Sequence, residues 1–195
     1  MLTIIGDVHG LHDSYLNLIH NKTSSVQVGD FGFNFHCLSG IDPDNHKIIG
    51  GNHDNYDMIG NCPNYLGDYG TAVVGNVEFF FVSGECSVDA NTRIEGRNWW
   101  RAEELDMATA YKAIEAYQAT KPRIVISHGC PADVLPFFVT NPNKYHPSRT
   151  AQILDAMWNS HRPELWVFGH HHVSKTLKVG DSTFRCLNEL ETMEI

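Results

Sequence analysis

Short apolar runs, each stopped by glycine, dominate the first quarter of the chain. Residues 2–5, 25–28 and 47–49 are rich in Ile, Val and Leu, and each run is typical of a short buried strand. Between the first two runs, apolar residues recur at helical spacing, so we predict a helix over about 11–19. After each strand, the glycine is followed by an Asp or Asn.

The rest of the chain alternates strands with two longer helices. The pattern predicts, in order, a hairpin of 71–74 and 77–82, a loop over 84–101, a helix over 103–120, a strand over 123–126, a loop over about 130–147, a helix from the N-cap Ser148 to Asn159, a strand over 165–168 and a hairpin around Gly180 and Asp181. Strands alternating with helices indicate an α/β fold.

Side chains that can bind metals follow five of these strands, each after an apolar run and a small residue. The set is Asp7, His9, Asp30, Asn52, His53, His128, His170 and His172. A lone histidine at a strand end is more often structural, but five strands ending alike indicate one site, since ligands of open α/β sheets bind beyond the strands' carboxyl ends. The absence of cysteine from the set favours Mn, Fe or Zn over softer metals.

Composition narrows the class of protein. The 195 residues suit one domain over 1–195, and a net charge of −9 without basic runs argues against binding long nucleic acid through its backbone. Five cysteines without CxxC spacing indicate a reducing compartment. The sequence shows neither an apolar run of the ~20 residues that cross a bilayer nor a signal peptide. We therefore expect a cytoplasmic protein with no membrane association and no obligate protein partner.

Five blocks of the sequence together resemble the calcineurin-like metallophosphoesterase superfamily, in particular its small bacterial and phage members. They are GDVHG (6–10), GD (29–30), GNHD (51–54), SHG (127–129) and GHHH (169–172). Any one block is a weak signal, whereas five in the right order over most of the chain are specific. The resemblance implies a four-layered α/β/β/α sandwich with mixed sheets and a site at the strand ends.

The resemblance also implies two divalent metal ions, with Mn²⁺ expected and Fe, Zn, Ni or Mg as alternatives. It assigns Asp7, His9 and His172 to the first ion, Asn52, His128 and His170 to the second, and Asp30 to both. A hydroxide bridging the two ions would attack phosphorus in line. His53 would act beside the phosphate without binding metal, either stabilising the transition state or protonating the leaving oxygen. His171 is expected to point away.

The second block departs from the protein phosphatases of the superfamily, which continue it as GDxxDRG. Here it reads GDFGFNF, so the arginine that grips a phosphomonoester and the aspartate that orients the catalytic histidine are both missing. We therefore favour phosphodiesters of nucleotides or short nucleic acids as substrates. A phosphomonoesterase or protein phosphatase is the alternative, and a non-catalytic scaffold is less favoured. Asp54 either orients His53 or stabilises its own turn.

Candidate substrate contacts come from three segments. The stretch 83–104 resembles a segment of small bacterial and phage members, and its Arg93 could reach a phosphate. We interpret Trp99 and Trp100 as packing on the sandwich, with stacking on substrate as the alternative. Phe33 and His36 either wall the pocket or bury their own loop.

The third segment is the loop over about 130–147, which we interpret as a candidate lid because long loops in compact domains are often functional. Its aromatic and histidine side chains are Phe137, Phe138, Tyr145 and His146.

Overall fold

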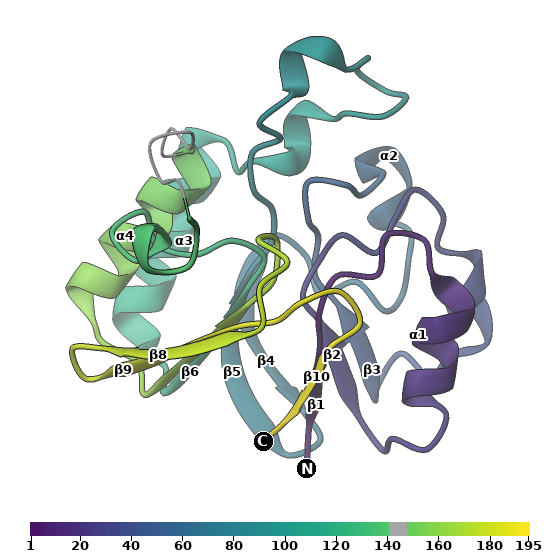
Figure 1. Cartoon of the computed structure of the whole chain (residues 1–195), viewed down its shortest axis with the longest axis horizontal. Coiled ribbons are helices and arrows are strands. Elements are labelled where there is room, and N and C mark those ends of the chain that lie inside the picture. The colour runs from purple at the N-terminus through teal and green to yellow at the C-terminus, as the bar shows by residue number, and fades with distance from the viewer. Residues whose placement is uncertain (141–147) are drawn as a thin grey trace.

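Two β-sheets face each other in the computed structural model, which describes residues 1–140 and 148–195, and helices cover both outer surfaces (Figure 1). The first sheet has the order β10-β1-β2-β3, formed by β1 (Thr3–Ile5), β2 (Ser25–Gln27), β3 (His46–Ile48) and β10 (Thr192–Glu194). The strands β1, β2 and β3 are parallel, and β10 runs antiparallel to β1.

The second sheet has the order β4-β5-β6-β7-β9-β8. Its strands are β4 (Tyr69–Val74), β5 (Val77–Val82), β6 (Ile124–Ser127), β7 (Leu165–Phe168), β8 (Lys175–Val179) and β9 (Ser182–Cys186). The central strands β5, β6, β7 and β9 are parallel, while β4 and β8 pair antiparallel at the edges. Both sheets are therefore mixed, as the motifs implied.

Alternating side chains of β5 show how one strand serves two cores. Phe79 and Phe81 belong to the cluster between the sheets, where they meet residues of the first sheet such as Ile4. Phe80 and Val82 belong instead to the cluster on the outer face of the second sheet. Because successive side chains of a strand point to opposite faces, an apolar run without polar alternation predicts a strand buried on both sides.

Helices close the two outer cores. The helices α3 (Met107–Thr120) and α4 (Arg149–Ser160) cover the second sheet, and α1 (His12–Ile19) with the short α2 (Tyr56–Ile59) covers the first (Figure 1). Tyr117 of α3 packs edge-on against Phe80 of β5, with ring centroids 5.3 Å apart. Tyr15 of α1 is fully buried in the core between these helices and the first sheet. The four layers confirm the predicted α/β/β/α sandwich.

One segment stands apart from the layers. Residues 84–106, here called the cap, follow β5 and project above the strand ends (Figure 1). The cap contains the 3-10 turns η2 (Ala90–Thr92) and η3 (Arg101–Glu103); two further 3-10 turns, η1 (His36–Gly40) and η4 (Leu135–Phe137), lie elsewhere. Both chain termini lie at the opposite end of the sandwich.

Three details differ from the sequence predictions. The helix expected from 103 begins at Met107, because the carboxylate of Asp106 accepts a hydrogen bond from the Thr109 N–H (2.9 Å) and caps it. Glu103 is left in η3 and is buried. Neither α2 nor β10 was predicted, since each is too short for a periodic pattern.

The candidate lid is described only in part. Phe137 is exposed, whereas Phe138 is buried with its ring edge-on to Phe168. Tyr145 and His146 lie outside the described residues. Within the part of the chain that is described, no helix is long and apolar enough to cross a membrane.

Candidate metal centre

The motif side chains meet where the strands of both sheets end. Asp7 follows β1, Asp30 follows β2 and His128 follows β6. The sharp turns that bring them together depend on glycine at two places. A Cβ on Gly51 would lie 2.3 Å from the backbone N of Asp30, and one on Gly169 would lie 2.1 Å from Asp7 Oδ1. Chain segments pack here more closely than any side chain would allow.

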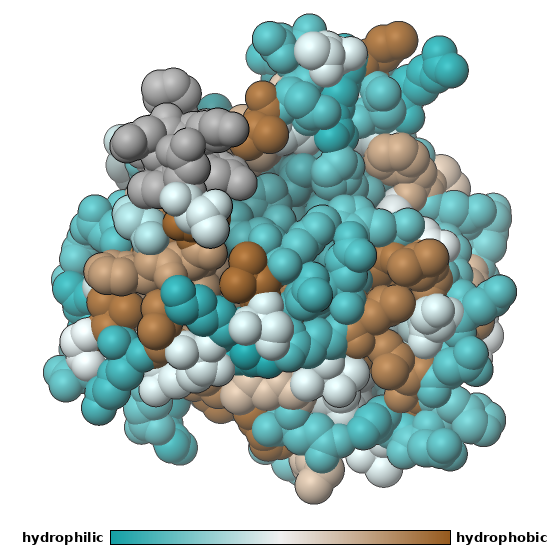
Figure 2. All heavy atoms as spheres, viewed as in Figure 1, coloured by the Kyte–Doolittle hydropathy of each residue, from teal (hydrophilic) through white to brown (hydrophobic). Residues whose placement is uncertain are grey.

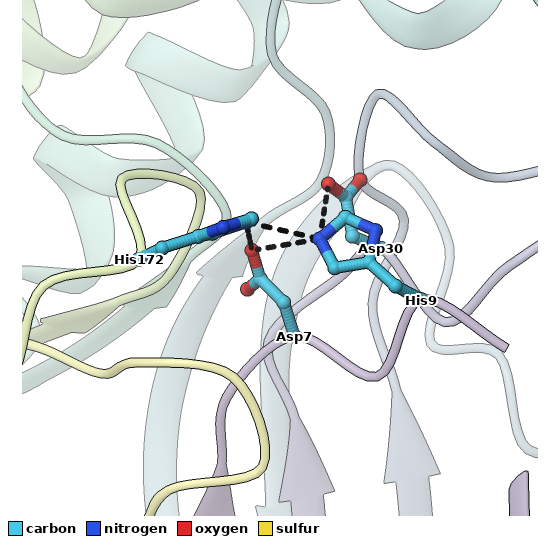
Figure 3. Close-up of side chains that lie close together, drawn as sticks. All are labelled: Asp7, His9, Asp30 and His172. Atoms are coloured by element: carbon cyan, nitrogen blue, oxygen red, sulfur yellow. Dashed lines mark hydrogen bonds and ion pairs between the residues drawn. The ribbon is translucent and has the colours of Figure 1, made fainter. Parts of the chain in front are cut away.

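A first group of possible ligands consists of Asp7, His9, Asp30 and His172, whose ligand atoms lie within 4.8 Å of one another. Figure 3 shows the four side chains pointing toward one another from three separate loops. The Nε2 atoms of His9 and His172 are 2.9 Å apart, and Asp7 Oδ2 is 3.1 Å from His172 Nε2. These are the residues that the resemblance assigned to the first ion together with the bridging aspartate.

A second group consists of Asp30, His128 and His170, whose ligand atoms also lie within 4.8 Å of one another. Asn52 belongs to it as well, because its Oδ1 lies 3.0 Å from His128 Nε2. Asp30 is therefore shared by both groups, and its carboxylate is almost fully buried. The structure thus brings together all seven residues that the motifs assigned to the metals.

The backbone at these residues is unusual. Among the described residues, positive φ angles outside glycine occur at His9, Asp30, Asn76, Lys121, His170, His172 and Leu190. Four of these are proposed metal ligands, with φ between 47° and 64°. Residues other than glycine adopt this left-handed backbone conformation at an energetic cost of order 1–3 kcal/mol each, and such strain is concentrated at functional sites. The sharp turns aim the side chains inward.

The donor atoms fit a cation. His128 Nδ1 lies 2.9 Å from the carbonyl of Val28, which can only accept, so the ring must donate there. Its Nε2 then faces two oxygens, Asp30 Oδ1 at 3.2 Å and Asn52 Oδ1 at 3.0 Å. A divalent ion among these three atoms would satisfy all of them, and nitrogen and oxygen donors suit borderline and hard ions.

Electrostatics point the same way. Burial disfavours the charged form of His128, yet the carboxylate of Asp30 raises the pKa of this imidazole to about 10. The hydrogen bond with Asp7 likewise raises the pKa of His172. The two buried carboxylates, Asp7 and Asp30, therefore favour a positive charge at this site. Protonated imidazole rings provide that charge when no metal ion is bound.

Asn52 is held by residues that the sequence analysis did not assign. Its Nδ2 donates to Ser87 Oγ (3.3 Å), and the Ser87 hydroxyl in turn donates to Glu103 Oε2 (2.8 Å). Glu103 Oε1 also accepts from the Ser87 N–H (2.7 Å). This chain of hydrogen bonds orients the amide so that Oδ1 faces the second group. Only packing of the cap reveals it, since Ser87 and Glu103 lie far from Asn52 in the sequence.

Glu189 is a second residue that the motifs did not indicate. Its carboxylate lies 3.3 Å from His172 Nδ1 and 3.8 Å from His9 Nε2. A carboxylate behind a histidine ligand fixes the orientation of the ring and increases its basicity. Glu189 lies three residues beyond Cys186, where β9 ends, and no recognisable sequence signal marks this position.

Asp54 stabilises its turn. Its carboxylate accepts hydrogen bonds from the backbone N–H groups of Gly51 (2.7 Å), Asp30 (3.0 Å) and Gly32 (2.7 Å). The side chain is fully buried and ties the loop after β3 to the loop after β2. Of the two interpretations left open for Asp54, the turn-stabilising one describes these contacts.

His53 lies at the edge of the centre beside Arg93. The His53 N–H donates to Asp30 Oδ1 (2.6 Å), and its ring stands edge-on to that of His9, with centroids 5.3 Å apart. Arg93 Nη1 is 3.0 Å from His53 Nδ1. Burial, the largest cause, lowers the pKa of His53, and the charge of Arg93 acts in the same direction.

Two other candidate substrate residues lie elsewhere. His36 lines a separate hollow with Met58 and Asn61, so the structure does not bring it to the metal centre. Phe33 packs against Trp100, with ring centroids 5.4 Å apart. Trp100 is buried and its indole donates to Asp57 Oδ2 (2.7 Å), so it packs on the sandwich. Short loops carry no periodicity that would have told inward from outward residues.

A hollow of about 320 Å³ opens over the centre, lined by Asp30, Asn52, His53, Arg93, His170 and His172 among others. Polar residues gather on this face beneath the cap (Figure 2). A second cavity of about 220 Å³ adjoins it and shares His170 and His171 with it. His171 thus lines both cavities and is not among the grouped ligands. The second cavity also contains the buried carboxyl of Glu85.

Comparison with known proteins shows which solved structures share this fold. No model of a known protein family matches the chain, and no curated protein sequence matches it. Among solved structures, phosphopantetheinyl hydrolase from Mycobacterium tuberculosis matches with a TM-score of 0.55 and 14% identity, over 96% of this chain and 89% of the other. GAP50, the anchor in the inner membrane complex of Plasmodium, matches with a TM-score of 0.50 and 12% identity, over 96% and 71%.

At such low identity these likenesses define the fold and nothing finer. The chain has the fold of the calcineurin-like metallophosphoesterases, as its five motif blocks predicted.

We predict that Gly51→Ala weakens metal binding roughly 10- to 100-fold, because the added Cβ displaces Asp30, the residue shared by both groups. Gly60→Ala is the matched control, since a Cβ there meets no atom within 4 Å and φ is −61°. Isothermal titration of metal-free protein with Mn²⁺ would measure both variants. Equal affinities for Gly51→Ala and the wild type would contradict the assignment of Asp30.

Glu103→Gln should weaken one metal site and spare the other. The amide that replaces the carboxylate has an acceptor at only one of its two terminal atoms, so it cannot accept from the Ser87 N–H at one position and from the Ser87 hydroxyl at the other, and Asn52 loses its orientation. We expect one step of a two-step Mn²⁺ titration to lose roughly tenfold or more in affinity while the other step is unchanged. Glu95→Gln, on the exposed side of the cap, is the control. Loss of affinity in both steps alike would argue against a selective role.

Glu85 should make stability depend on pH. Burial raises its pKa from 4.5 to about 7. Because the folded state holds this proton more tightly, its contribution to stability is fully present below about pH 4.5 and is lost as the pH rises to about 7. Urea unfolding of metal-free protein should show this slope, at most about 1.4 kcal/mol per pH unit. Glu85→Gln should flatten it, whereas the exposed Glu78→Gln should not; an unchanged slope in Glu85→Gln would refute the prediction.

Proposed function

We propose that this protein is a metal-dependent phosphoesterase whose substrates are phosphodiesters of nucleotides or short nucleic acids. The observation that carries the proposal is the convergence of two ligand groups on one buried carboxylate, Asp30. Two groups that share a ligand are the arrangement that a two-metal site requires. Six of the seven ligands predicted from the motifs belong to these groups, and Oδ1 of the seventh, Asn52, lies 3.0 Å from His128 Nε2.

The residues would divide between two divalent ions, with Mn²⁺ as the expected metal. Asp7, His9 and His172 would hold one ion, Asn52, His128 and His170 the other, and Asp30 both. When bound, such ions supply Lewis acidity toward a phosphate oxygen and lower the pKa of a water molecule that can attack phosphorus.

The protein's own side chains would then place and polarise the substrate. The hollow beneath the cap leads to the ligands of both groups, with His53 and Arg93 on its wall. Arg93 offers a charged donor to a phosphate oxygen, and the ring of His53 stands beside that of His9 without belonging to either ligand group. His53 is therefore the candidate catalytic residue.

The charge of the hollow favours a diester over a monoester. Among its lining residues Arg93 is the only arginine or lysine, and Asp89 pairs with it at 2.7 Å from Nε. A phosphodiester carries one negative charge, whereas a monoester near neutral pH carries up to two. One partly neutralised arginine suits the smaller charge, in line with the missing arginine of the second block.

The alternatives remain testable. A phosphomonoesterase would use the same ligands, and the fold alone does not determine the function, since GAP50 shares it and is described as an anchor. Against a non-catalytic scaffold stands the unbroken ligand set, which a protein without metal chemistry has no physical reason to assemble around buried carboxylates.

Two variants test the proposal on protein reloaded with Mn²⁺. Asp30→Asn should lose metal from both sites, because it removes charge from the shared ligand. His53→Ala should retain both ions and lose roughly 10²- to 10⁴-fold in turnover of bis(4-nitrophenyl) phosphate. Metal analysis and steady-state rates measure the two effects. Near-normal turnover by His53→Ala would show that its assigned role is wrong.

Comparing substrates separates the classes of activity. Rates on bis(4-nitrophenyl) phosphate should exceed those on 4-nitrophenyl phosphate, and a panel of cyclic nucleotides, dinucleotides, single-stranded DNA and RNA and phosphopeptides would locate the natural class. A preference for the monoester or for phosphopeptides would establish the alternative enzyme. Failure to bind two equivalents of Mn²⁺ would favour the scaffold.

A further inference from the structure

We propose that the second cavity, which adjoins the metal centre, binds the base of a nucleotide ester by an edge that carries an N–H donor, with Glu85 as the hydrogen-bond acceptor. The inference rests on the proposed function, because it names the part of the substrate that this site would select. The cavity and its contacts are features of the fold and do not depend on that function.

The second cavity is next to the hollow over the metal centre. The two share lining residues, among them His171 and the proposed ligand His170. The carboxyl of Glu85 is also close to the centre, because a Cβ on Gly129 would lie 2.1 Å from Glu85 Oε2, and Gly129 directly follows His128. A substrate whose phosphorus lies at the metal centre can therefore extend one of its ester groups into this cavity.

The lining of the cavity combines an apolar surface with a few polar groups. Val88, Leu135 and Ala151 contribute aliphatic carbon, whereas Glu85 and Ser148 contribute a carboxyl and a hydroxyl. Pockets that bind small organic molecules have this composition. The cavity measures about 220 Å³, below the roughly 300–1,000 Å³ of pockets that enclose a drug-sized ligand. It therefore suits a single ring system better than a whole nucleotide.

Glu85 is a buried acid that the proposed metal chemistry does not use. The residue is only 5% exposed, its Oε1 accepts the N–H of Cys86 (2.9 Å), and Ser148 also hydrogen-bonds to this carboxyl. None of the ion pairs among residues 1–140 and 148–195 includes Glu85. A buried carboxylate without a cationic partner is costly unless hydrogen bonds compensate it. A ligand that brings N–H donors into the cavity would add this compensation.

The carboxyl determines which edge of a base fits. An ionised carboxylate has only acceptors and a protonated carboxyl retains acceptor capacity, so Glu85 can accept from an N–H in either form. Cytosine presents an amino group where a uracil ring of the same size presents a carbonyl oxygen, and carboxylates accept from the cytosine amino group in protein–DNA complexes. A carbonyl oxygen facing an ionised carboxylate would oppose two acceptors with no proton between them. We therefore expect cytosine to be preferred over uracil.

The first test measures occupation of the cavity in metal-free protein, so that it requires no activity. The methyl NMR resonances of Leu135 and Ala151, which line the cavity, are followed while cytidine or uridine is added. Cytidine should bind at least about tenfold more tightly than uridine, the order expected for a hydrogen bond to a charged group. In Glu85→Gln the two affinities should agree within about threefold, because glutamine offers both a donor and an acceptor. Equal affinities in the wild type, or no shift of these methyl groups, would overturn the proposal.

The second test uses Mn²⁺-loaded protein and the 4-nitrophenyl esters of cytidine and uridine 5′-monophosphate. The value of kcat/KM for the cytidine ester should exceed that for the uridine ester at least about tenfold. Glu85→Gln should reduce this ratio to less than about threefold. The ratio is taken within each variant, so a general loss of activity does not alter it. A ratio near one in the wild type, or an unchanged ratio in Glu85→Gln, would overturn the assignment of Glu85.

A variant that narrows the cavity keeps the tests decisive if Glu85→Gln folds poorly. Ala151→Leu adds side-chain volume to the cavity wall, so cytidine should no longer shift the Leu135 methyl groups and the ratio of the two esters should fall toward one. Ala156→Leu, at an exposed position of the same helix, is the control and should behave as the wild type does. Undiminished cytidine binding by Ala151→Leu would place the base outside this cavity. If the wild type hydrolyses no phosphate ester, the proposed function fails, yet the nucleoside titration still decides what the cavity binds.

Discussion

The carboxylate of Asp30 is the point on which the rest of the centre depends. It is buried, it stands at a positive φ angle of 56°, and it belongs to both groups of possible ligands. Its backbone is secured by the carboxylate of Asp54, and one of its own oxygens accepts the His53 N–H. A charge so deeply buried must be compensated, and the imidazoles gathered around it, with or without metal ions, are what compensates it.

The cap supplies contacts to this centre that the layered sandwich does not provide. The layered sandwich brings strand ends together in any protein with this fold, but here an additional segment reaches back over the site. It orients Asn52 through Ser87 and Glu103 and contacts His53 through Arg93. Two adjacent residues of one motif, a proposed ligand and a proposed catalytic histidine, are thereby held by different parts of the same segment.

Much of the fold could be predicted from local patterns. Apolar runs of three to six residues marked nearly every strand, and helical spacing marked α1, α3 and α4. The ligand set followed from five motif blocks, each a strand end with a small residue before the functional side chain. Predictions weakened where no pattern exists: the start of α3 depends on the single capping residue Asp106, and His36 gave no sign of facing a different hollow.

Periodicity and strand-end motifs are local properties of the chain, so the strands, the main helices and the converging side chains could be identified from the sequence, and the layers followed from the resemblance of the motif blocks. The residues that support those side chains are known only from the folded structure. Arg93 is 40 positions from His53, and Glu103 is 16 from Ser87. Contacts of this kind depend on how a loop without periodicity packs over the sheets, and that is set by the sum of many burial and hydrogen-bond terms across the whole fold. The residue beside His53 was therefore an arginine from the cap, where the motif pattern would have supplied an aspartate.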